Sequence, residues 1–271
     1  MWKTLLDRIR RAIRPLRRLG RSRPVYLLDD VAYGYLNRKT GELFAGFAIN
    51  GNDTVVDVGC GAGAASEFAA QCGAAVYAVD IDPAAIASVQ HRLKGLKLSR
   101  PLHTVVSDSN PLPLADGVAT RVLAQEVLEH VDDPQQFMAE LVRVGRPGAR
   151  YLLSVPAAGA ESVHKVLAPA PYWRKPNHLR VFEGDSFDCL VQDAGLVIEK
   201  RINYSFYWAM WWILFWSDRG GFDLGAPGTP VLKHWNNTWE ALLRTPNGPR
   251  VKKALDDFMP KSRVLIARKA A

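Results

Sequence analysis

Hydrophobic and polar positions follow a pattern that predicts strands and helices in alternation. Short runs rich in β-branched residues are separated by longer stretches with helical spacing and by glycine or proline turns. The runs that predict strands are 54–58, 75–79, 104–106, 121–124, 149–155 and 196–204. Helices are expected near Ala64, from the capping pair Asp82-Pro83, and over 185–194. Such alternation is typical of an α/β fold with a parallel sheet and helices on both faces.

The same pattern divides the chain into five parts, and its length allows one large domain with added segments. Residues 51–206 would form the core, with an Ala- and Pro-rich loop at 159–180 as a lid. A helical cap at 24–50 would cover the cofactor crevice of the core with Tyr33, Tyr35, Leu43, Phe44 and Phe47. The other parts are a basic tail at 1–23, an insertion at 207–262 and a final strand region at 263–271.

The formal net charge of +8 comes from the basic tail, which holds nine Lys or Arg residues and one acid. Its apolar side chains recur at helical spacing with the arginines on the other face, and Pro15 should interrupt the helix. A basic amphipathic segment favours an anionic membrane surface. A solvated arm packed on the domain and a nucleic-acid contact are the alternatives. Because arginines interrupt every apolar stretch, a secretory signal is not expected.

A second apolar segment, 206–216, contains no charge and four of the eight tryptophans. It is too short to span a bilayer, which takes about 20 residues. Its aromatic surface suits a lipid interface, the wall of an apolar substrate pocket, or ordinary core packing. The first two can hold together, because a lipophilic substrate would enter from the membrane.

The three cysteines, Cys60, Cys72 and Cys189, stand without metal-like pair spacing. This usage suits a reducing compartment such as the cytoplasm and argues against a zinc site or a disulfide framework. No metal is therefore predicted from the sequence.

The strongest chemical signal is the run 54–63, Thr-Val-Val-Asp-Val-Gly-Cys-Gly-Ala-Gly. The strand carries Asp57 two residues before a turn in which glycines let the backbone approach a ligand. The free N–H groups of the following helix would point at that ligand. Such a unit is typical of a nucleotide-like cofactor bound in a crevice at the carboxyl end of a parallel sheet.

The acids near the turn decide between two cofactors. The glycines loosely match the nicotinamide fingerprint, which leaves a dehydrogenase as an alternative. A carboxylate at Asp57 would repel a pyrophosphate but attract the ammonium and sulfonium of S-adenosylmethionine. Asp80, at the end of the second strand, can accept both ribose hydroxyls. Ser107 and Asp108 end the third strand, where they can meet the adenine amino group. We therefore expect S-adenosylmethionine.

Four motifs extend this interpretation: Asp57-Val-Gly-Cys-Gly-Ala-Gly63, Asp80-Ile-Asp-Pro83, Asp108 followed by Leu112-Pro-Leu-Ala-Asp116, and Glu126-Val-Leu-Glu-His130-Val-Asp-Asp-Pro134. In this order they resemble the class I S-adenosylmethionine-dependent methyltransferases, in the branch of ubiquinone/menaquinone C-methyltransferases and small-molecule O-methyltransferases. The resemblance covers roughly residues 40–205. It implies a Rossmann-like sheet of seven mostly parallel strands, with 263–267 as the seventh. The cofactor-binding residues that it implies are Asp57, Gly59, Cys60, Gly61, Gly63, Asp80, Ile81, Ser107, Asp108, Gln125 and Glu126.

The resemblance also implies a role for each end of the site. The glycine turn and Asp57 would hold the methionyl part, Asp80 the ribose and Asp108 the adenine. Gln125 and Glu126 would flank the methionyl end. The family usually has an acid just before the fourth strand, where this chain has Ala119-Thr120. A weaker loop contact is expected there, with the cofactor site intact.

Methyl transfer asks the protein mainly to align the donor methyl with the acceptor. An oxygen or carbon acid also needs a base, for which His is the first candidate. His178 is preferred because similar family members place this stretch over the active site. His130, after the fourth strand, is the second candidate, and His164 and Tyr172 lie on the expected lid. For each His the alternative role is a hydrogen bond that anchors a loop.

The sequence therefore predicts methyl transfer from S-adenosylmethionine to a small, lipophilic acceptor at a membrane surface. One alternative is a soluble O-methyltransferase of a sugar or natural product. Another is a non-catalytic cofactor-binding protein that docks a partner through its basic tail. Nucleic acid is a minor option, because Gln125-Glu-Val-Leu does not match the Asp/Asn-Pro-Pro-aromatic motif of base amino-methyltransferases.

Overall fold

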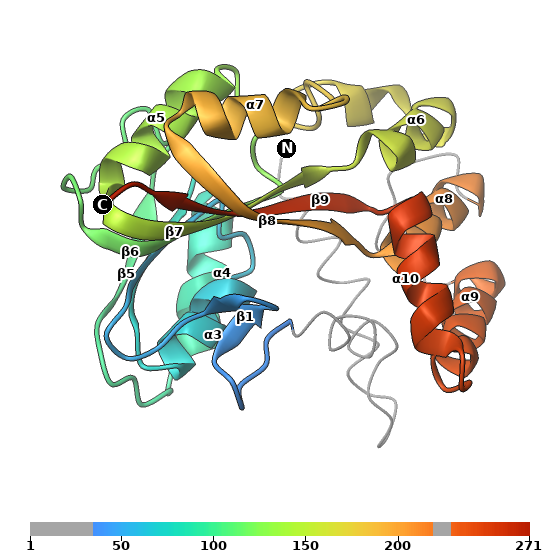
Figure 1. The fold of residues 1–271 in the computed structure, drawn as a ribbon, viewed down its shortest axis with the longest axis horizontal. Helices are drawn as coiled ribbons and strands as arrows, with labels where there is room; N and C mark the ends of the chain where they lie inside the picture. Colours follow the sequence, from blue (N-terminus) through green and yellow to red (C-terminus); the bar gives the residue numbers. More distant parts are fainter. Residues whose placement is uncertain (1–34, 219–228) are drawn as a thin grey trace.

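The computed structural model describes residues 35–218 and 229–271, so the basic tail and the first part of the expected cap lie outside the described residues. The strands of the main sheet are β3 (Thr54–Val58), β4 (Ala75–Asp80), β5 (Leu102–Val106), β6 (Ala119–Gln125), β7 (Gly145–Pro156), β8 (Leu196–Tyr204) and β9 (Ser262–Lys269). Their order is β5-β4-β3-β6-β7-β9-β8 (Figure 1). β9 is antiparallel to both neighbours, and the other pairs are parallel. The predicted seven-stranded, mostly parallel sheet is confirmed.

Helices cover both faces of this sheet (Figure 1). On one face lie α3 (Ala64–Gln71) and α4 (Pro83–Leu93), and on the other lie α5 (Pro134–Val144) and α7 (Ser186–Asp193). Successive residues of β3 alternate between the two cores, with Val55 on the α3 side and Val56 on the α5 side. α4 begins as predicted, with the Asp82 carboxylate accepting a hydrogen bond from the Ala84 N–H at 2.9 Å.

The described part of the expected helical cap is a β-hairpin instead of a helix. β1 (Glu42–Phe44) pairs with β2 (Phe47–Ala48), and the expectation of helix for this stretch is wrong. Gly41 lies in the turn before the hairpin and Gly46 in the turn between its strands. Their φ values of 71° and 92° are ones that glycine adopts readily and that a helix does not contain. The apolar side chains of the hairpin are buried in the core on the α3 side.

The expected lid loop at 159–180 is also partly wrong, because its first half is the helix α6 (Ala158–Leu167), followed by a 3-10 turn at Ala170–Trp173. The buried side chains of α6 are Ala160, Glu161 and His164. Two of these three are polar, so the inward face of α6 lacks the apolar spacing by which a helix is recognised.

The described residues of the Trp-rich insertion form three helices, α8 (Phe206–Asp218), α9 (Pro230–Leu243) and α10 (Gly248–Phe258). Together with α6 they gather at the edge where β7 and β8 end (Figure 1). Phe215 and Trp216 of α8 are buried against Tyr172 and Leu232, so part of this segment is ordinary core. Among the described residues no helix combines the length and apolar character needed to cross a membrane.

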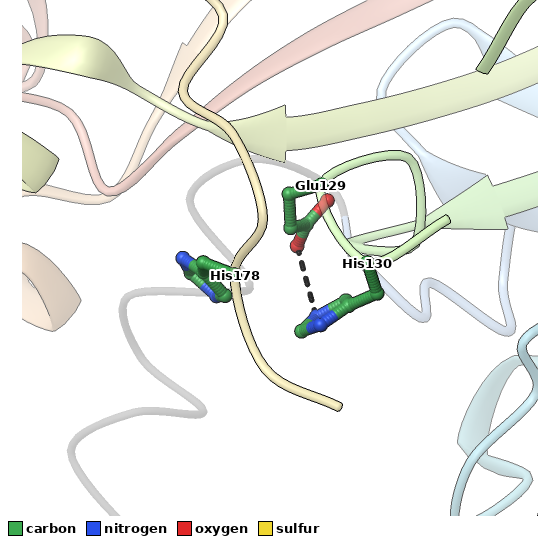
Figure 2. Close-up of side chains that lie close together, drawn as sticks. All are labelled: Glu129, His130 and His178. Atoms are coloured by element: carbon green, nitrogen blue, oxygen red, sulfur yellow. Dashed lines mark ion pairs between the residues drawn. The ribbon is translucent and has the colours of Figure 1, made fainter. Parts of the chain in front are cut away.

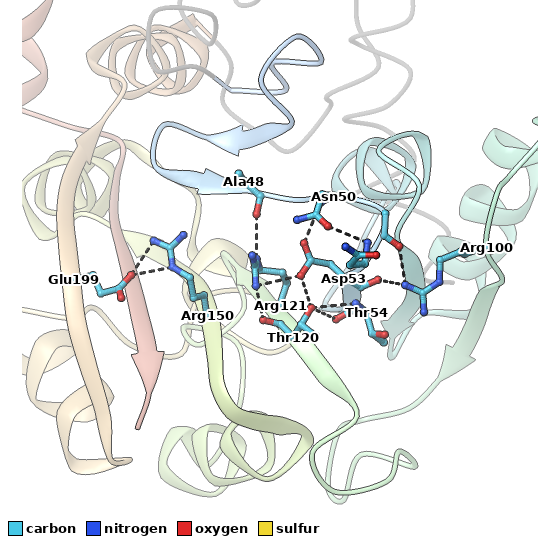
Figure 3. A network of polar contacts seen from close by, with 11 residues as sticks. Ala48, Asn50, Asp53, Thr54, Arg100, Thr120, Arg121, Arg150 and Glu199 are labelled. Carbon is cyan, nitrogen blue, oxygen red and sulfur yellow. Dashed lines mark hydrogen bonds and ion pairs between the residues drawn. The ribbon is translucent and has the colours of Figure 1, made fainter. Parts of the chain in front are cut away.

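At the opposite edge of the sheet, a polar network ties the amino ends of β3 and β6 together (Figure 3). The Thr120 hydroxyl donates to the buried Asp53 carboxylate at 2.6 Å and accepts from the Thr54 N–H at 3.0 Å. Arg121 pairs with the same carboxylate at 3.2 Å. The Thr120 hydroxyl thus joins the amino ends of β3 and β6, and the weaker loop contact expected at Ala119-Thr120 stays a prediction.

Candidate functional site

The parallel register brings the ends of four strands to one edge of the sheet. Asp57 of β3 lies beside Ala78 of β4 and Leu123 of β6, and β5 adds its end beside β4. The side chains that follow these strands therefore share one edge, as the motif spacing predicts. The residues brought to this edge are Asp57, Asp80, Ile81, Ser107, Asp108, Gln125 and Glu126.

The glycine turn between β3 and α3 accepts no side chain at two of its positions. Gly59 and Gly63 have φ of 72° and 77°, in the region that favours glycine. A Cβ on Gly59 would lie 2.3 Å from Val127 Cγ2, and one on Gly63 would lie 2.8 Å from Val89 Cγ2. The turn is therefore packed closely against Val127 and Val89, and its backbone also borders a cavity.

A cavity of about 280 Å³ lies against this turn. It is lined by five predicted cofactor residues, which are Asp57, Gly59, Cys60, Gln125 and Glu126. Of the five side chains expected to cover it, Tyr35 and Phe44 line the cavity, Leu43 and Phe47 are buried in the core instead, and Tyr33 lies outside the described residues. Other lining residues, which the sequence analysis missed, are Ser154, Tyr204, Ser262 and Val264.

Asp57 is almost fully buried, with 4% of its surface exposed. The Ser66 hydroxyl donates to its carboxylate at 2.6 Å. Burial raises the pKa of Asp57 to about 6, because desolvation penalises the charged carboxylate more than the Ser66 hydrogen bond favours it. A carboxylate in this position gains from a cationic ligand that neutralises it.

Asp80 is held with its carboxylate fixed by two backbone donors. The Gly61 N–H donates to one oxygen at 2.8 Å and the Asp82 N–H donates to the other at 2.9 Å. Each oxygen keeps a second lone pair, so the group can accept two ligand hydroxyls. Beside it, Ile81 leaves 69% of its surface exposed. An exposed apolar side chain next to a fixed carboxylate fits a nucleoside, with the base on Ile81 and the ribose on Asp80.

The two predicted histidines lie together beyond the end of β6. Their rings meet edge to face with centroids 5.0 Å apart. His178 Nδ1 is 2.8 Å from Glu161, and His130 Nδ1 is 3.1 Å from the Pro176 carbonyl. Burial disfavours protonation of His130, but the Glu129 carboxylate outweighs it and raises the pKa of the imidazole.

Glu161 is the centre of a buried polar cluster. Its carboxylate accepts hydrogen bonds from His178, from His164 at 3.1 Å and from the Tyr172 hydroxyl at 3.0 Å. Burial favours the neutral acid, yet the two histidines outweigh it and hold the pKa of Glu161 well below its usual range. Burial and the charge of Glu161 raise the pKa of Tyr172, so this hydroxyl stays a donor.

Lys261 connects this cluster to the cavity, since its ammonium pairs with Glu126 at 2.6 Å. Burial lowers the pKa of the ammonium, but the charges of Glu126 and Glu161 outweigh burial and raise it. The Glu126 carboxylate also accepts a hydrogen bond from the Ser154 hydroxyl at 3.0 Å. The backbone φ of Glu126 is 56°, which lies outside the range of a β-strand.

Sequence reasoning missed Glu161 and Lys261 for an identifiable reason. Glu161 belongs to the stretch interpreted as a loop, and Lys261 stands just before the last strand, far from every motif. The only local signal was an acid among small apolar residues at 157–163. Glu129 was inside a quoted motif, but no role followed from its position there.

Comparison with known proteins gives a consistent result. Residues 56–153 match the family model described as a methyltransferase domain. Norajmaline N-methyltransferase of Rauvolfia serpentina is 29% identical over 148 residues, 53% of this chain and 49% of that protein. Ubiquinone biosynthesis O-methyltransferase of Aeromonas salmonicida (strain A449) is 27% identical over 158 residues, 58% of this chain and 62% of that protein.

Solved structures share the fold. Geranyl diphosphate C-methyltransferase of Streptomyces coelicolor A3(2), in complex with S-adenosyl-L-homocysteine, superposes with a TM-score of 0.56 at 15% identity, covering 90% of this chain and 77% of that one. The chain spans about half to three fifths of the length of the two curated relatives. The family model itself, at residues 56–153, covers the sheet from β3 to most of β7.

Proposed function

Because the chain contains a class I S-adenosylmethionine-dependent methyltransferase domain, we propose that the protein transfers the cofactor's methyl group to a small, lipophilic acceptor. One observation carries the proposal. The glycine turn, Asp57 and Asp80 meet at one sheet edge, beside a cavity that continues onto aromatic side chains. The cofactor supplies a reactive sulfonium methyl when bound, and the protein has to align the acceptor with it.

The methionyl end would lie in the cavity. Asp57 would face the ammonium, which neutralises a buried carboxylate, and the turn at Gly59 and Cys60 would leave room for the backbone contact. Gln125 and Glu126 line the same cavity and would flank the sulfur.

The nucleoside end would lie along the more open edge. Asp80 would accept the ribose hydroxyls, since its carboxylate is already fixed by two N–H groups. The adenine would pack on the exposed Ile81. Ser107 and Asp108 follow β5 at the same edge and would contact the adenine amino group.

His178 and His130 are the residues that we propose to activate the acceptor. Each ring has its Nδ1 against an oxygen that can only accept, so in the neutral imidazole Nε2 carries the lone pair. That lone pair can take a proton from an acidic acceptor or bind a cation that polarises it. Glu161 orients His178 and would stabilise its imidazolium.

Two observations support a small, lipophilic acceptor. The cavity is partly walled by Tyr35, Phe44 and Tyr204, whose rings contact one another. The names of the relatives, norajmaline N-methyltransferase and ubiquinone biosynthesis O-methyltransferase, refer to small molecules. We further propose that the protein works in the cytoplasm at a membrane surface, to which its basic tail binds.

Isothermal calorimetry with S-adenosylmethionine tests the cofactor site. We expect Asp80→Ala to weaken binding by about tenfold to a hundredfold, because two hydrogen bonds to a carboxylate are lost. Asp257→Ala, an exposed acid on α10, is the matched control and should bind as wild type does. Equal affinity of the Asp80→Ala variant, or tighter binding of a nicotinamide cofactor, would contradict the proposal.

A transfer assay tests the activity itself. Methyl-labelled S-adenosylmethionine is offered with panels of lipophilic phenols and amines and of sugars. Labelled product from the lipophilic panel supports the proposal, and product from sugars alone supports the soluble O-methyltransferase alternative. Cofactor binding without transfer to any panel member supports the non-catalytic alternative.

A further inference from the structure

Three side chains beyond the end of β6 form a set of metal-ligand type. Glu129 and His130 lie on the loop after β6, and His178 comes from the segment before α7 (Figure 2). One ligand atom from each lies within 4.8 Å of the other two. Ligands on one metal ion are about 3 Å apart, so modest side-chain rotations would close the set.

The hydrogen bonds of both histidines fix the ring atoms that face the set. His178 Nδ1 lies 2.8 Å from the Glu161 carboxylate, and His130 Nδ1 lies 3.1 Å from the Pro176 carbonyl. Since both partners only accept hydrogen bonds, Nδ1 carries the hydrogen in each ring, and in the neutral imidazole Nε2 then carries the lone pair that a metal ion would take. Metal-binding histidines are held by carboxylate or carbonyl partners in this way.

Glu129 lacks the partners that a buried carboxylate needs. Its side chain is 1% exposed, and within the described residues neither oxygen has a hydrogen-bond donor. His130 Nε2 lies 3.5 Å from its carboxylate, which is long for a charge-assisted hydrogen bond. Leaving a buried carboxylate unpaired is costly, so Glu129 is suited to bind a cation.

The surrounding charge also favours a cation. Glu126, Glu129 and Glu161 stand against one ammonium, that of Lys261, which pairs with Glu126. The Arg180 guanidinium, on the same side, donates to the carbonyl oxygens of Leu128 and Val131. A divalent cation would add positive charge at the position where the two Nε2 atoms and the Glu129 carboxylate converge.

We propose that Glu129, His130 and His178 bind a divalent transition-metal ion through one carboxylate oxygen and two Nε2 atoms. Two imidazoles and a carboxylate suit zinc, iron(II), cobalt(II) or manganese(II) more than magnesium or calcium. The cysteine spacing on which the sequence prediction of no metal was based does not bear on this site, since no cysteine takes part.

With three protein ligands, the ion keeps open positions. On the proposed function, an acceptor oxygen takes one of them, and the ion lowers the pKa of that hydroxyl. The metal site itself does not depend on this step.

Cobalt(II) titration of the chelator-treated full chain tests the site. Visible absorption reports nitrogen and oxygen ligands, and the absence of a thiolate charge-transfer band excludes the cysteines. We expect one equivalent to bind and zinc to displace it. Glu129→Gln and His178→Ala should each weaken binding at least about tenfold, and His91→Ala, on the exposed face of α4, should not.

Two further measurements keep the test decisive. His130→Asn alters a side chain that is 33% exposed, so it is expected to keep its thermal melting temperature while losing metal affinity. If cobalt fails to bind, or binds equally to all three site variants, the proposal is wrong and Glu129 pairs with a protonated His130. If the metal binds as expected but no methyl transfer is found, the proposed function fails and the site stands.

Discussion

At the scale of single residues, Asp57 connects the sequence motif to the electrostatics of the cavity. Its carboxylate is buried beside Ser66, and its pKa is raised to about 6 because burial disfavours the charge. A bound ammonium would reverse this effect, since the opposite charge favours the ionised form. Cofactor binding and the protonation of Asp57 should therefore be coupled.

We predict that affinity for S-adenosylmethionine falls as pH drops below about 6. The proton must then leave Asp57 before the ammonium is accommodated, which costs up to about tenfold in affinity per pH unit. Calorimetry across this range checks the slope. Methylthioadenosine, which lacks the ammonium, is the matched ligand and should show a flat profile. A flat profile for S-adenosylmethionine as well would show that Asp57 does not interact with the ammonium of the methionyl group.

The same shift predicts the pH dependence of stability without cofactor. The stabilising contribution of protonated Asp57 is fully present below the unfolded pKa of 3.8 and is lost as pH rises through about 6. Asp57→Asn removes the buried charge, so at neutral pH this variant should gain up to about 3 kcal/mol in free energy of unfolding while losing cofactor affinity. Urea denaturation checks it, and a destabilised variant would contradict it.

Gly59 tests how closely the turn is packed. Gly59→Ala adds a Cβ 2.3 Å from Val127 Cγ2 at φ of 72°. We expect a loss of about 3 kcal/mol in free energy of unfolding, from backbone strain and overpacking together. Gly95→Ala has φ of 83° with nothing within 4 Å, so it carries the strain alone, about 1 kcal/mol. The double variant Gly59→Ala/Val127→Ala should lose less free energy of unfolding than the sum of the two single variants, because removing the Val127 methyl groups relieves the clash. Losses that simply add would exclude the clash.

At the scale of elements, the strands were predictable to within a few residues. β3 was expected at 54–58 and is found at Thr54–Val58, and the edge strand β8 was expected at 196–204 and is found at Leu196–Tyr204. Inner strands such as β3 are buried on both faces, so their apolar runs are continuous and ended by turn residues. The hairpin at 42–48 and α6 were missed, because short strands show little periodicity and the buried face of α6 carries Glu161 and His164.

The site, too, has one part that the sequence predicts and another part that it does not. Residues that follow strands within one motif, such as Asp57 and Asp80, share an edge because parallel strands do, and spacing alone predicts it. Contacts among Glu161, Lys261 and His178 join an unpredicted helix, the residue just before β9 and the loop before α7. No local pattern encodes such an arrangement, so tertiary structure was needed to find it.

Thr120 tests the tie between β3 and β6 at the opposite edge. Thr120→Val keeps the shape but removes the hydroxyl donor of the Asp53 carboxylate, which keeps the Asn50 N–H and Arg121, and leaves the Thr54 N–H without its acceptor. We expect about 2 kcal/mol lower free energy of unfolding, with unchanged cofactor affinity. Thr104→Val, on β5, loses only an exposed partner, Gln90, and should change stability by less than about 0.5 kcal/mol. Equal effects would mean that the network contributes little.

At the scale of the whole molecule, the chemistry and the added helices lie at the same edge of the sheet. α6 and the helices α8–α10 gather where β7 and β8 end, and the cavity lies at the carboxyl ends of β3 and β6 (Figure 1). The burial of Phe215 and Trp216 gives α8 a packing role, while Trp208, Trp211 and Trp212 are half-buried. Half-exposed tryptophans near a substrate edge are consistent with a lipid contact.

The basic tail provides the test of membrane binding. Nine Lys or Arg residues in 1–23 would each contribute about 1 kcal/mol near an anionic leaflet, so several contacts give useful affinity. We predict that the intact chain co-sediments with vesicles rich in phosphatidylserine and not with pure phosphatidylcholine vesicles. A chain lacking residues 1–23 should stay in the supernatant, and added salt should release the intact chain because it screens the charges. The shortened chain must bind S-adenosylmethionine as the intact one does, which shows that its core is folded. Equal sedimentation of both chains would show that the tail does not bind the membrane. The half-exposed tryptophans of α8 would then have to account for the binding.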